Sequence, residues 1–407
     1  MSITSSISQA IEQPERGFSR QEFKQRFAIA QNKMREQKLA AILLTTEHDI
    51  HYYSGYFTQF WQSPTRPWYL ILPSEGLPIA VIPKIGVECM AKVWLTDIRS
   101  WSSPDPDDDG VDLLSEALIE VVARAKGSGL NNIGIQAGRE THLRMPLVDF
   151  EQTKTNLHSH DPKIQFVNAS PVMREQRMLK SPQEIAKVRY VAQAVSSVFE
   201  RLFEFVHPGM SEIEIFRAFK IQCLTAGVDD VAYLVGAADQ NGYSDIISPA
   251  SSRKLQTSDV LILDTGCTFD GYYCDFDRNY AFGKADPSAH DAHQAVWQAT
   301  EQGFAAAKPG NSSADLFNAM NNVLQKAGAL GDSVGRFGHG LGLQLTEPPS
   351  HTSWDNTILK PGMVITLEPG MEFAPGKLMV HEENIVITET GAEYLSKRAP
   401  AEMPVYA

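Results

Sequence analysis

Two acidic residues flank a turn in the segment at 260–280, VLILDTGCTFDGYYCDFDRNY. Asp264 ends an apolar run that is typical of a buried strand, and Asp275 follows a glycine-containing turn. A carboxylate at the end of a buried strand is costly unless it is paired or ligates a cation. A single acid of this kind is more often exposed or salt-bridged, but two of them together predict a cation site.

Further ligand-type residues occur later in the chain. Glu368 ends the apolar run ITLE, Glu382 lies inside the strand-like VHEENI, and His339 stands between glycines in FGHGLG, where the backbone can approach a site closely. Four carboxylates and one imidazole form a hard donor set that suits a pair of divalent ions. We expect Mn²⁺, with Fe²⁺, Co²⁺ or Zn²⁺ as alternatives. Such a pair shares a water and lowers its pKa, so that hydroxide is available near neutral pH.

An internal repeat organises the second half of the chain. The segment PGMSEIEIFRAFKIQCLTAG begins at Pro208, and PGNSSADLFNAMNNVLQKAG begins 101 residues later at Pro309. Each copy has the pattern of a turn, a capped helix and a helix-ending glycine, and each follows another predicted helix, at 182–205 and 288–307. Two similar halves predict a pseudo-two-fold axis, and a site on that axis would draw two carboxylates from each half. Chance similarity between two amphipathic helices is the alternative, and it does not account for the matching glycines.

The first part of the chain has a different pattern. A capping box at Ser19 to Glu22 predicts a helix that ends near residue 37. Short apolar runs predict buried strands, with a helix between them at 112–125; the runs lie at 40–45, 69–72, 79–82 and 132–136. A second capping box, at Ser181 to Glu184, follows a polar stretch. We therefore predict an α/β (α+β) protein with an N-terminal α/β domain at 1–170 and a second domain at 171–407.

The composition is that of a well-packed globular protein, with 43% hydrophobic and 21% charged residues. A net charge of -13 argues against a nucleic-acid or anionic-membrane partner. No apolar run approaches the ~20 residues of a membrane-spanning helix. The four cysteines are scattered without a C-x-x-C pair, which favours a reducing compartment, so we expect a cytoplasmic protein.

The ordered series of ligand-type residues has a recognisable spacing. Asp264 and Asp275 have Gly271-Tyr272 between them, and GHGLG, EPP, EPG and Glu382 follow in that order. The series resembles that of the pita-bread metalloenzymes, the family of methionine aminopeptidase, Xaa-Pro aminopeptidase, prolidase and creatinase. The segment HYYSGY at 51–56 is similar to one in the N-terminal domain of creatinase- and prolidase-like members.

This resemblance implies a smaller creatinase-like N-terminal α/β domain followed by a pita-bread catalytic domain, and a homodimer. It implies two divalent metal ions, and it implies that hydroxide generated at these ions attacks an amide-type carbon. In that family the residue at the position of Glu368 also serves as acid and base for the water between the ions. The implied metal ligands are Asp264, Asp275, His339, Glu368 and Glu382.

The chain departs from the peptidase pattern beside these ligands. Peptidases of the family carry two more histidines, and the corresponding positions here are Ile247 and Thr346. His351 is the nearest replacement for the second histidine, so Thr346 and His351 join Glu368 as candidate catalytic residues. Outer groups of this kind hold the scissile carbonyl and contribute ~3–4 kcal/mol per donor, so their loss bears on the substrate more than on the metal.

Two further departures lie on predicted strands. An arginine usually stands two residues before the last glutamate ligand, where this chain has Val380, and a threonine usually stands two residues beyond Asp275, where this chain has Asp277. Asp277 shares the strand face of Asp275. We expect Asp277 to pair with Arg278 or Arg253, and an additional metal contact is the alternative.

Three residues are candidate substrate contacts. In creatinase-like members the region after HYYSGY helps to form the active site of the neighbouring subunit, and here it contains Trp61 and Arg66. Trp61 could form an apolar wall and Arg66 a fork for a substrate carboxylate, while an aromatic dimer contact without a ligand is the alternative. Tyr243 is the third candidate, as a donor that could replace a missing histidine.

The leading hypothesis is a dinuclear metal hydrolase that cleaves an amide-type C–N bond of a small substrate, with Xaa-Pro dipeptides as the default class. A first alternative keeps the fold and acts on a non-peptide metabolite as a hydrolase or lyase, as creatinase and the dimethylsulfoniopropionate lyase of this family do. A second alternative is a catalytically silent binding protein, which predicts degraded metal ligands.

Overall fold

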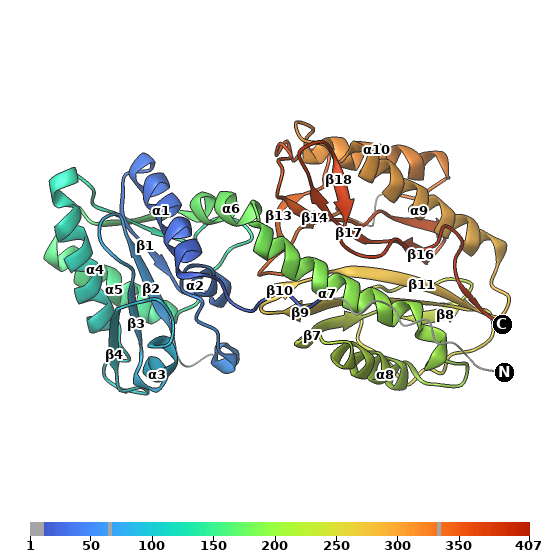
Figure 1. Cartoon of the computed structure of the whole chain (residues 1–407), viewed down its shortest axis with the longest axis horizontal. Helices are drawn as coiled ribbons and strands as arrows, with labels where there is room; N and C mark the ends of the chain where they lie inside the picture. The colour runs from blue at the N-terminus through green and yellow to red at the C-terminus, as the bar shows by residue number, and fades with distance from the viewer. Residues whose placement is uncertain (1–11, 64–66, 332–334) are drawn as a thin grey trace. The chain divides into compact units, whose positions relative to one another are not determined.

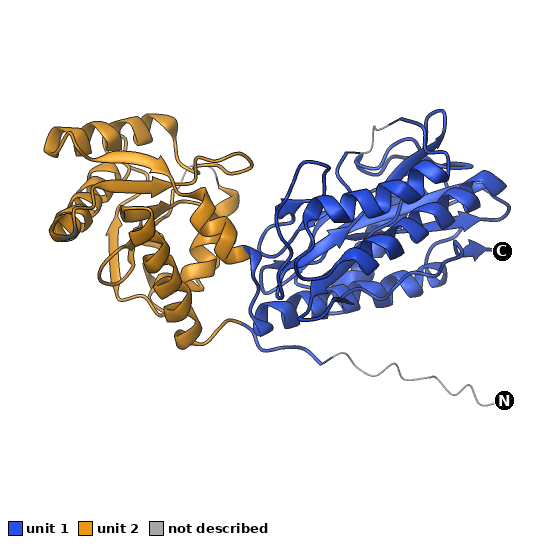
Figure 2. Ribbon diagram, turned by 90° about the horizontal axis from the view of Figure 1, so that it is seen from above, with its two compact units in different colours: residues 1–16, 178–407 blue, residues 17–177 orange. Residues whose placement is uncertain are grey.

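A computed structural model describes residues 12–63, 67–331 and 335–407 of the chain. These residues form two compact units, Gly17–Arg177 and Met178–Ala407, and the second unit also includes residues 12–16 (Figure 2). The helix that begins at Ser170 belongs to the first unit up to Arg177, because Gln176 accepts a hydrogen bond from the Tyr53 hydroxyl at 2.8 Å and Arg177 pairs with Asp49 at 2.9 Å.

The first unit is a six-stranded sheet with the order β4-β3-β2-β1-β5-β6. Its central strand β1 is buried throughout, runs antiparallel to β2 and parallel to β5, and contributes Leu43 to a core shared with Val81 and Leu118. The helix expected after Ser19 begins there, with the Ser19 hydroxyl accepting from the Glu22 amide. The elements are α1 (Arg20–Glu36), β1 (Leu39–Leu44), α2 (Glu47–Ser54), β2 (Tyr69–Pro73), β3 (Ile79–Pro83), α3 (Val87–Met90), β4 (Asp97–Trp101), α4 (Val111–Ala125), β5 (Asn132–Ile135), α5 (Leu147–His160), β6 (Gln165–Asn168) and α6 (Ser170–Met178).

The second unit combines two sheets with four long helices (Figure 1). One sheet has the order β10-β9-β11-β19, with β7 and β8 also paired to the long strand β9, and the other has the order β13-β12-β14-β17-β18. A hairpin of β15 and β16 completes the strands. The elements are α7 (Pro182–Glu200), α8 (Glu212–Thr225), β7 (Asp230–Val235), β8 (Ala238–Gln240), β9 (Asp259–Phe269), β10 (Tyr272–Tyr273), β11 (Phe276–Phe282), α9 (Pro287–Ala306), α10 (Ser313–Lys326), β12 (His339–Gly340), β13 (Glu347–Ser350), β14 (Val364–Leu367), β15 (Gly370–Ala374), β16 (Lys377–Val380), β17 (Glu383–Ile387), β18 (Ala392–Tyr394) and β19 (Val405–Tyr406).

The predicted internal repeat is confirmed in this unit. Both α8 and α10 begin with a capping box, and the glycine before each turns with a positive φ, +93° at Gly209 and +94° at Gly310. The amide of Gly209 donates to Leu255 O at 2.8 Å, and the amide of Gly310 donates to Leu359 O at 3.1 Å. These acceptors are 104 residues apart, the same separation as Asp264 and Glu368. The two acids therefore occupy equivalent places in the two halves.

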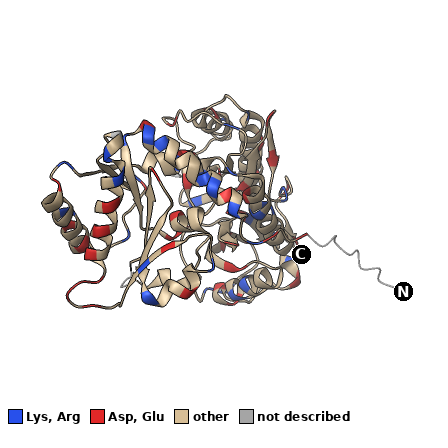
Figure 3. Ribbon diagram, turned by 60° about the vertical axis from the view of Figure 1, so that its left-hand side comes forward, with Lys and Arg blue, Asp and Glu red and all other residues tan. Residues whose placement is uncertain are grey.

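Charged residues of both signs are interspersed along the helices in the view of Figure 3. In the first unit, Glu120 of α4 pairs at 2.7 Å with Arg99 of β4, which also pairs with Asp97 of the same strand at 3.0 Å. Across the described ranges, none of the helices is both long and apolar enough to cross a bilayer.

Candidate metal centre

The five predicted ligands lie on strands of both sheets in the second unit or directly beside them, and Asp264 lies in the middle of its strand. Asp264 lies on β9 and Asp275 directly precedes β11, while His339 opens β12 of the other sheet. Glu368 follows the last residue of β14, and Glu382 directly precedes β17. The antiparallel pairs β9–β11 and β14–β17 thus each contribute two carboxylates, as the repeat predicts.

The structure brings the side chains of these residues together. The Nε2 atom of His339 lies 3.4 Å from Asp275 Oδ2 and 3.7 Å from Glu368 Oε2. One ligand atom each from Asp275, His339 and Glu382 lies within 4.8 Å of the others. Asp264 approaches the same group, and its carboxylate accepts a hydrogen bond from the Tyr233 hydroxyl. Sequence reasoning missed Tyr233, because its contact with Asp264 depends on the pairing of β7 with β9, which the sequence alone does not show.

The pKa values of the four ligand carboxyl groups are raised above the ordinary carboxyl range. Burial raises the pKa of Asp264, Asp275 and Glu382 well above the ordinary carboxyl range, and repulsion from neighbouring carboxylates adds to the rise at Asp264 and Glu382. Burial and the Asp275 charge also raise the pKa of Glu368, although His339 and Arg336 oppose the rise. In the described part of the chain, Asp264 Oδ1 and Glu382 Oε1 are buried without a hydrogen-bond partner. Buried acids with unpaired oxygens fit a divalent cation as the missing partner.

The local backbone orients the imidazole of His339. Its Nδ1 lies 2.9 Å from Gly340 O, which assigns the proton to Nδ1 and directs the Nε2 lone pair toward the carboxylates. Gly338 has a φ of +136°, and a Cβ there would lie 2.4 Å from both His351 Cδ2 and Thr366 O. Position 338 therefore requires glycine, because of its positive φ and because a side chain would clash with His351 and Thr366.

Thr346 and His351 lie close to this centre. His351 is fully buried, its Nδ1 is 2.6 Å from Ser313 Oγ, and burial lowers its pKa to about 3. Its Nε2 has no hydrogen-bond partner among the residues that the structure describes. Thr346 Oγ1 accepts a hydrogen bond from Arg336 Nη2 at 3.2 Å. The catalytic roles of Thr346 and His351 remain predictions.

Arg336 is a functional candidate that sequence reasoning missed. Besides its contact with Thr346, its Nη1 donates to Ser350 Oγ at 3.3 Å and its Nε lies 3.8 Å from Glu368 Oε1. The only sequence signal was its place three residues before His339 in RFGHG.

The expected pairing of Asp277 is wrong. Arg278 instead pairs with Glu383 at 3.0 Å, and Arg253 pairs with Asp259 at 2.7 Å. Asp277 is buried opposite Asp264, and its Oδ1 has no hydrogen-bond partner within the described ranges. Burial and the Asp264 charge raise the pKa of Asp277 well above its usual range.

The three candidate substrate residues have different surroundings. Tyr243 is fully buried, and its hydroxyl donates to Asn279 Oδ1 at 2.8 Å and accepts from the Val380 amide at 3.0 Å, so it joins strands and is not retained as a substrate contact. Trp61 belongs to the first unit, where it is buried beside Trp68 with the Arg144 guanidinium 5.0 Å from its ring. Arg66 lies outside the described residues.

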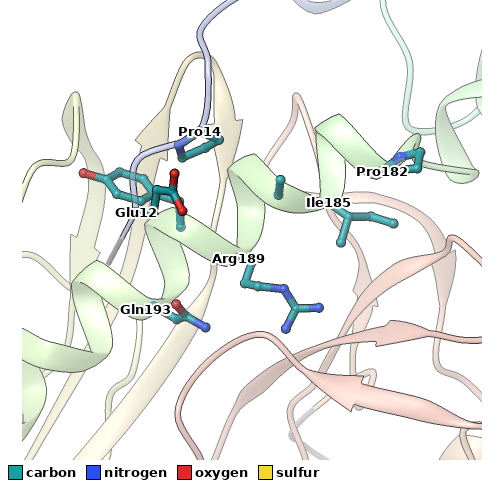
Figure 4. Close-up of a pocket in the computed structure, with 8 residues that line it drawn as sticks. Glu12, Pro14, Pro182, Ile185, Arg189 and Gln193 are labelled. Atoms are coloured by element: carbon teal, nitrogen blue, oxygen red, sulfur yellow. The ribbon is translucent and has the colours of Figure 1, made fainter. Parts of the chain in front are cut away.

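A pocket of about 400 Å³ lies elsewhere in the second unit, on the outer side of α7 (Figure 4). It is lined by Pro182, Ile185, Arg189 and Gln193 of that helix and by Glu12 and Pro14 of the N-terminal segment. It contains none of the predicted ligands, so its size does not make it the reactive site.

Comparison with known proteins agrees with this geometry. Residues 186–389 match the family model of Metallopeptidase family M24, and residues 26–179 match that of the Creatinase/Prolidase N-terminal domain. The chain belongs to metallopeptidase family M24. As an M24 protein it is a metal-dependent hydrolase, and the family implies divalent metal ions as cofactors.

Similar M24 proteins extend over nearly the whole chain. The probable dipeptidase PepE of Mycobacterium tuberculosis is 28% identical over 389 residues, which cover 93% of this chain and 95% of that protein. The Xaa-Pro dipeptidase of Pyrococcus horikoshii is 24% identical over 366 residues, which cover 89% of this chain and 94% of that protein.

Solved structures show the same fold. The dipeptidase PepE of Mycobacterium ulcerans superposes with a TM-score of 0.80 at 25% identity, covering 95% of this chain and 99% of that one. The prolidase of Thermococcus sibiricus superposes with a TM-score of 0.83 at 24% identity, covering 96% of this chain and all of that one. The pita-bread fold with a creatinase-like N-terminal domain is therefore confirmed.

Proposed function

We propose that this M24 protein is a dinuclear metal-dependent dipeptidase that hydrolyses the C–N bond of Xaa-Pro-type dipeptides. The observation that carries the proposal is the convergence of four carboxylates, of which Asp275 and Glu382 are buried, and the Nε2 of His339 on one place. Relatives named as dipeptidase and Xaa-Pro dipeptidase, over nearly the full length, support a small peptide substrate.

The chain's own residues have distinct roles in this reaction. Asp264, Asp275, His339, Glu368 and Glu382 would hold the two ions. When bound, the two ions would polarise the scissile carbonyl and lower the pKa of a water molecule. Glu368 takes a proton from the attacking water and delivers it to the departing amine nitrogen.

Hydrolysis of a dipeptide panel tests the proposal. Ala-Pro and Met-Pro are compared with Ala-Ala and Met-Ala, with MnCl₂ added, and the Asp264→Asn variant serves as the inactive reference. We expect kcat/KM for the proline dipeptides to exceed that of the variant at least a thousandfold. Rates for every dipeptide no higher than those of Asp264→Asn would reject the peptidase function.

We propose Mn²⁺ as the working ion. An oxygen-rich donor set with a single imidazole supports a hard divalent metal over Zn²⁺. Elemental analysis of protein purified without added metal, followed by reconstitution of the metal-free protein with Mn²⁺, Fe²⁺, Co²⁺ or Zn²⁺, compares the candidates. Highest activity with Zn²⁺ would contradict this choice.

A non-peptide substrate is the second candidate, and a specific observation favours it. The two peptidase histidines are absent, and at the position of the first, Ile247 exposes 78% of its surface. Activity on a small cyclic or N-alkyl amide, with none on the dipeptide panel, would support this alternative. The full ligand set argues against a silent binding protein.

We also propose a cytoplasmic homodimer in which Trp61 and Arg66 contribute to the neighbouring subunit's site. Light scattering gives the mass in solution. If the protein is dimeric, Arg66→Met should raise KM for dipeptides with a free carboxylate more than for their amides. A monomer with normal activity would contradict the proposal.

A further inference from the structure

A guanidinium is held beside the metal centre by two hydroxyls of the β13 region. Arg336 Nη2 donates to Thr346 Oγ1 at 3.2 Å, and Nη1 donates to Ser350 Oγ at 3.3 Å. These two contacts fix the plane of the guanidinium, since each engages a different terminal nitrogen. The third nitrogen, Nε, lies 3.8 Å from Oε1 of Glu368.

One of the two hydroxyls that hold Arg336 belongs to Thr346. Thr346 occupies the position just before Glu347 at which peptidases of the family carry a histidine. A threonine is shorter than a histidine, and here its hydroxyl accepts a hydrogen bond from Arg336. A hydrogen-bond donor beside the metal centre is therefore supplied by Arg336, and not by the residue at position 346.

The side chain of Arg336 is more exposed to solvent than those of the neighbouring ligands. Its side chain is 30% exposed, compared with 20% for Glu368 and 4% for His339. Its charge acts on the centre, because it lowers the pKa of Asp275 and Glu368 against the effect of burial. A cation at the open side of an acidic centre can contact a bound substrate.

We propose that Arg336 is a catalytic residue that donates hydrogen bonds to the oxygen of the scissile carbonyl, in place of the histidines absent at positions 247 and 346. The inference rests on the proposed amide hydrolysis. As water attacks the carbonyl carbon, the π electron pair moves to oxygen, where Arg336 stabilises the charge. When the C–N bond breaks, that pair returns and the amine nitrogen takes its proton from Glu368. A fixed donor of this kind acts more strongly on the transition state than on the substrate.

Kinetics of Arg336→Met and Arg336→Lys test this role. We expect kcat of Arg336→Met to fall about 10²- to 10³-fold with little change in KM, and Arg336→Lys to retain part of the activity. The fall should be equal for Met-Pro and for Met-Pro amide, because both contain the same scissile carbonyl. Arg189→Met, a change at an arginine on α7 that pairs with Glu393, is the matched control and should leave kcat unchanged.

Two measurements separate this role from a structural one. Titration with Mn²⁺ should give the same stoichiometry and affinity for Arg336→Met as for the unmodified protein. Free guanidinium chloride should restore part of the kcat of an Arg336→Ala variant. Unchanged kcat, loss of Mn²⁺ binding, or a fall confined to the free-acid substrate would each overturn the proposal.

Failure of the proposed function would be visible separately. If the unmodified protein cleaves none of the peptides, the dipeptidase proposal fails, and inorganic phosphate then reports on Arg336 alone. In the Mn²⁺-loaded protein, Arg336→Met should weaken phosphate binding at least fivefold by calorimetry, since phosphate presents the anionic oxygens that the guanidinium would stabilise. Equal phosphate affinity in the two proteins would overturn the role of Arg336.

Discussion

Asp264 and Asp277 are directly opposite each other on the antiparallel strands β9 and β11. Side chains at opposite positions share one face of the sheet, so the two carboxylates lie side by side, and that of Asp277 is buried. The charge of Asp264 raises the pKa of Asp277, after the larger effect of burial. The metal-free centre thus carries repulsion that a bound cation would relieve.

An Asp277→Asn substitution should raise the Tm of the metal-free protein, because it removes one of two adjacent acids, and burial and the Asp264 charge both disfavour the ionised form of Asp277. Mn²⁺ affinity should fall severalfold, since a neighbouring negative charge favours the cation. Thermal unfolding in EDTA and calorimetric titration measure the two effects, with exposed Asp291→Asn as the control. A less stable metal-free variant would contradict the interpretation.

Metal binding should stabilise the second unit. A ligand that binds only the folded state adds about 2.7 kcal/mol at a hundredfold excess over Kd, so Tm should rise with Mn²⁺ concentration. The rise should disappear in Glu382→Gln, which removes one of the clustered ligand atoms. Scanning calorimetry with and without Mn²⁺ makes the comparison. An equal rise in the variant would show that the stabilising ion binds elsewhere.

Replacement of Gly338 by alanine should displace His339 and weaken metal binding. The new Cβ would lie 2.4 Å from Thr366 O and His351 Cδ2, at a φ of +136°. We expect a loss of more than about 1 kcal/mol of stability and at least tenfold weaker Mn²⁺ binding. Gly310→Ala is the control, because Gly310 also has a positive φ, +94°, but nothing lies within 4 Å of its added Cβ. Equal Mn²⁺ affinities in the two variants would exclude the clash as the cause.

His293 should make the protein sensitive to acid. It is buried on α9, and burial, with the charge of His381, lowers its pKa to about 3. The unfolded chain takes up a proton near pH ~6.5, whereas the folded protein does not until far lower pH. The contribution of His293 to the free energy of unfolding should therefore fall by about 1.4 kcal/mol per pH unit as pH drops below ~6.5 toward ~3.

A His293→Gln variant should remove this part of the pH dependence. Urea unfolding of metal-free protein between about pH 7 and pH 4.5 measures the slope, and exposed His160→Gln is the control. The slope of His293→Gln should be shallower by up to one proton, while that of His160→Gln should match the unmodified protein. Identical slopes in all three proteins would show that His293 does not contribute.

Much of the architecture could be predicted because it depends on local patterns. The capping box at Ser19 fixed the start of α1, and the matching turns at Gly209 and Gly310 revealed two related halves. The ligand-type residues were found by their order along the chain. Apolar runs located β1, β2, β3 and β5 because buried strands require them.

The missed features depend on contacts between distant segments. Arg336 reaches Glu368 across 32 residues, and nothing near either residue predicts the contact. Tyr243 looked like a free donor, but a tyrosine in a turn-rich segment gives no sign that Asn279 and Val380 will engage its hydroxyl. The same limit explains Asp277, because the sequence near Arg278 and Arg253 does not show that these arginines pair with Glu383 and Asp259.

Each of the two sheets supplies metal ligands, and these ligands extend along the chain from Asp264 to Glu382. Ions held by both sheets would close a loop of more than a hundred residues, much as a disulfide does, and such a closure restricts the unfolded chain. In a protein whose cysteines are all unpaired, the cofactor would then also be the cross-link that fastens one half of the domain to the other.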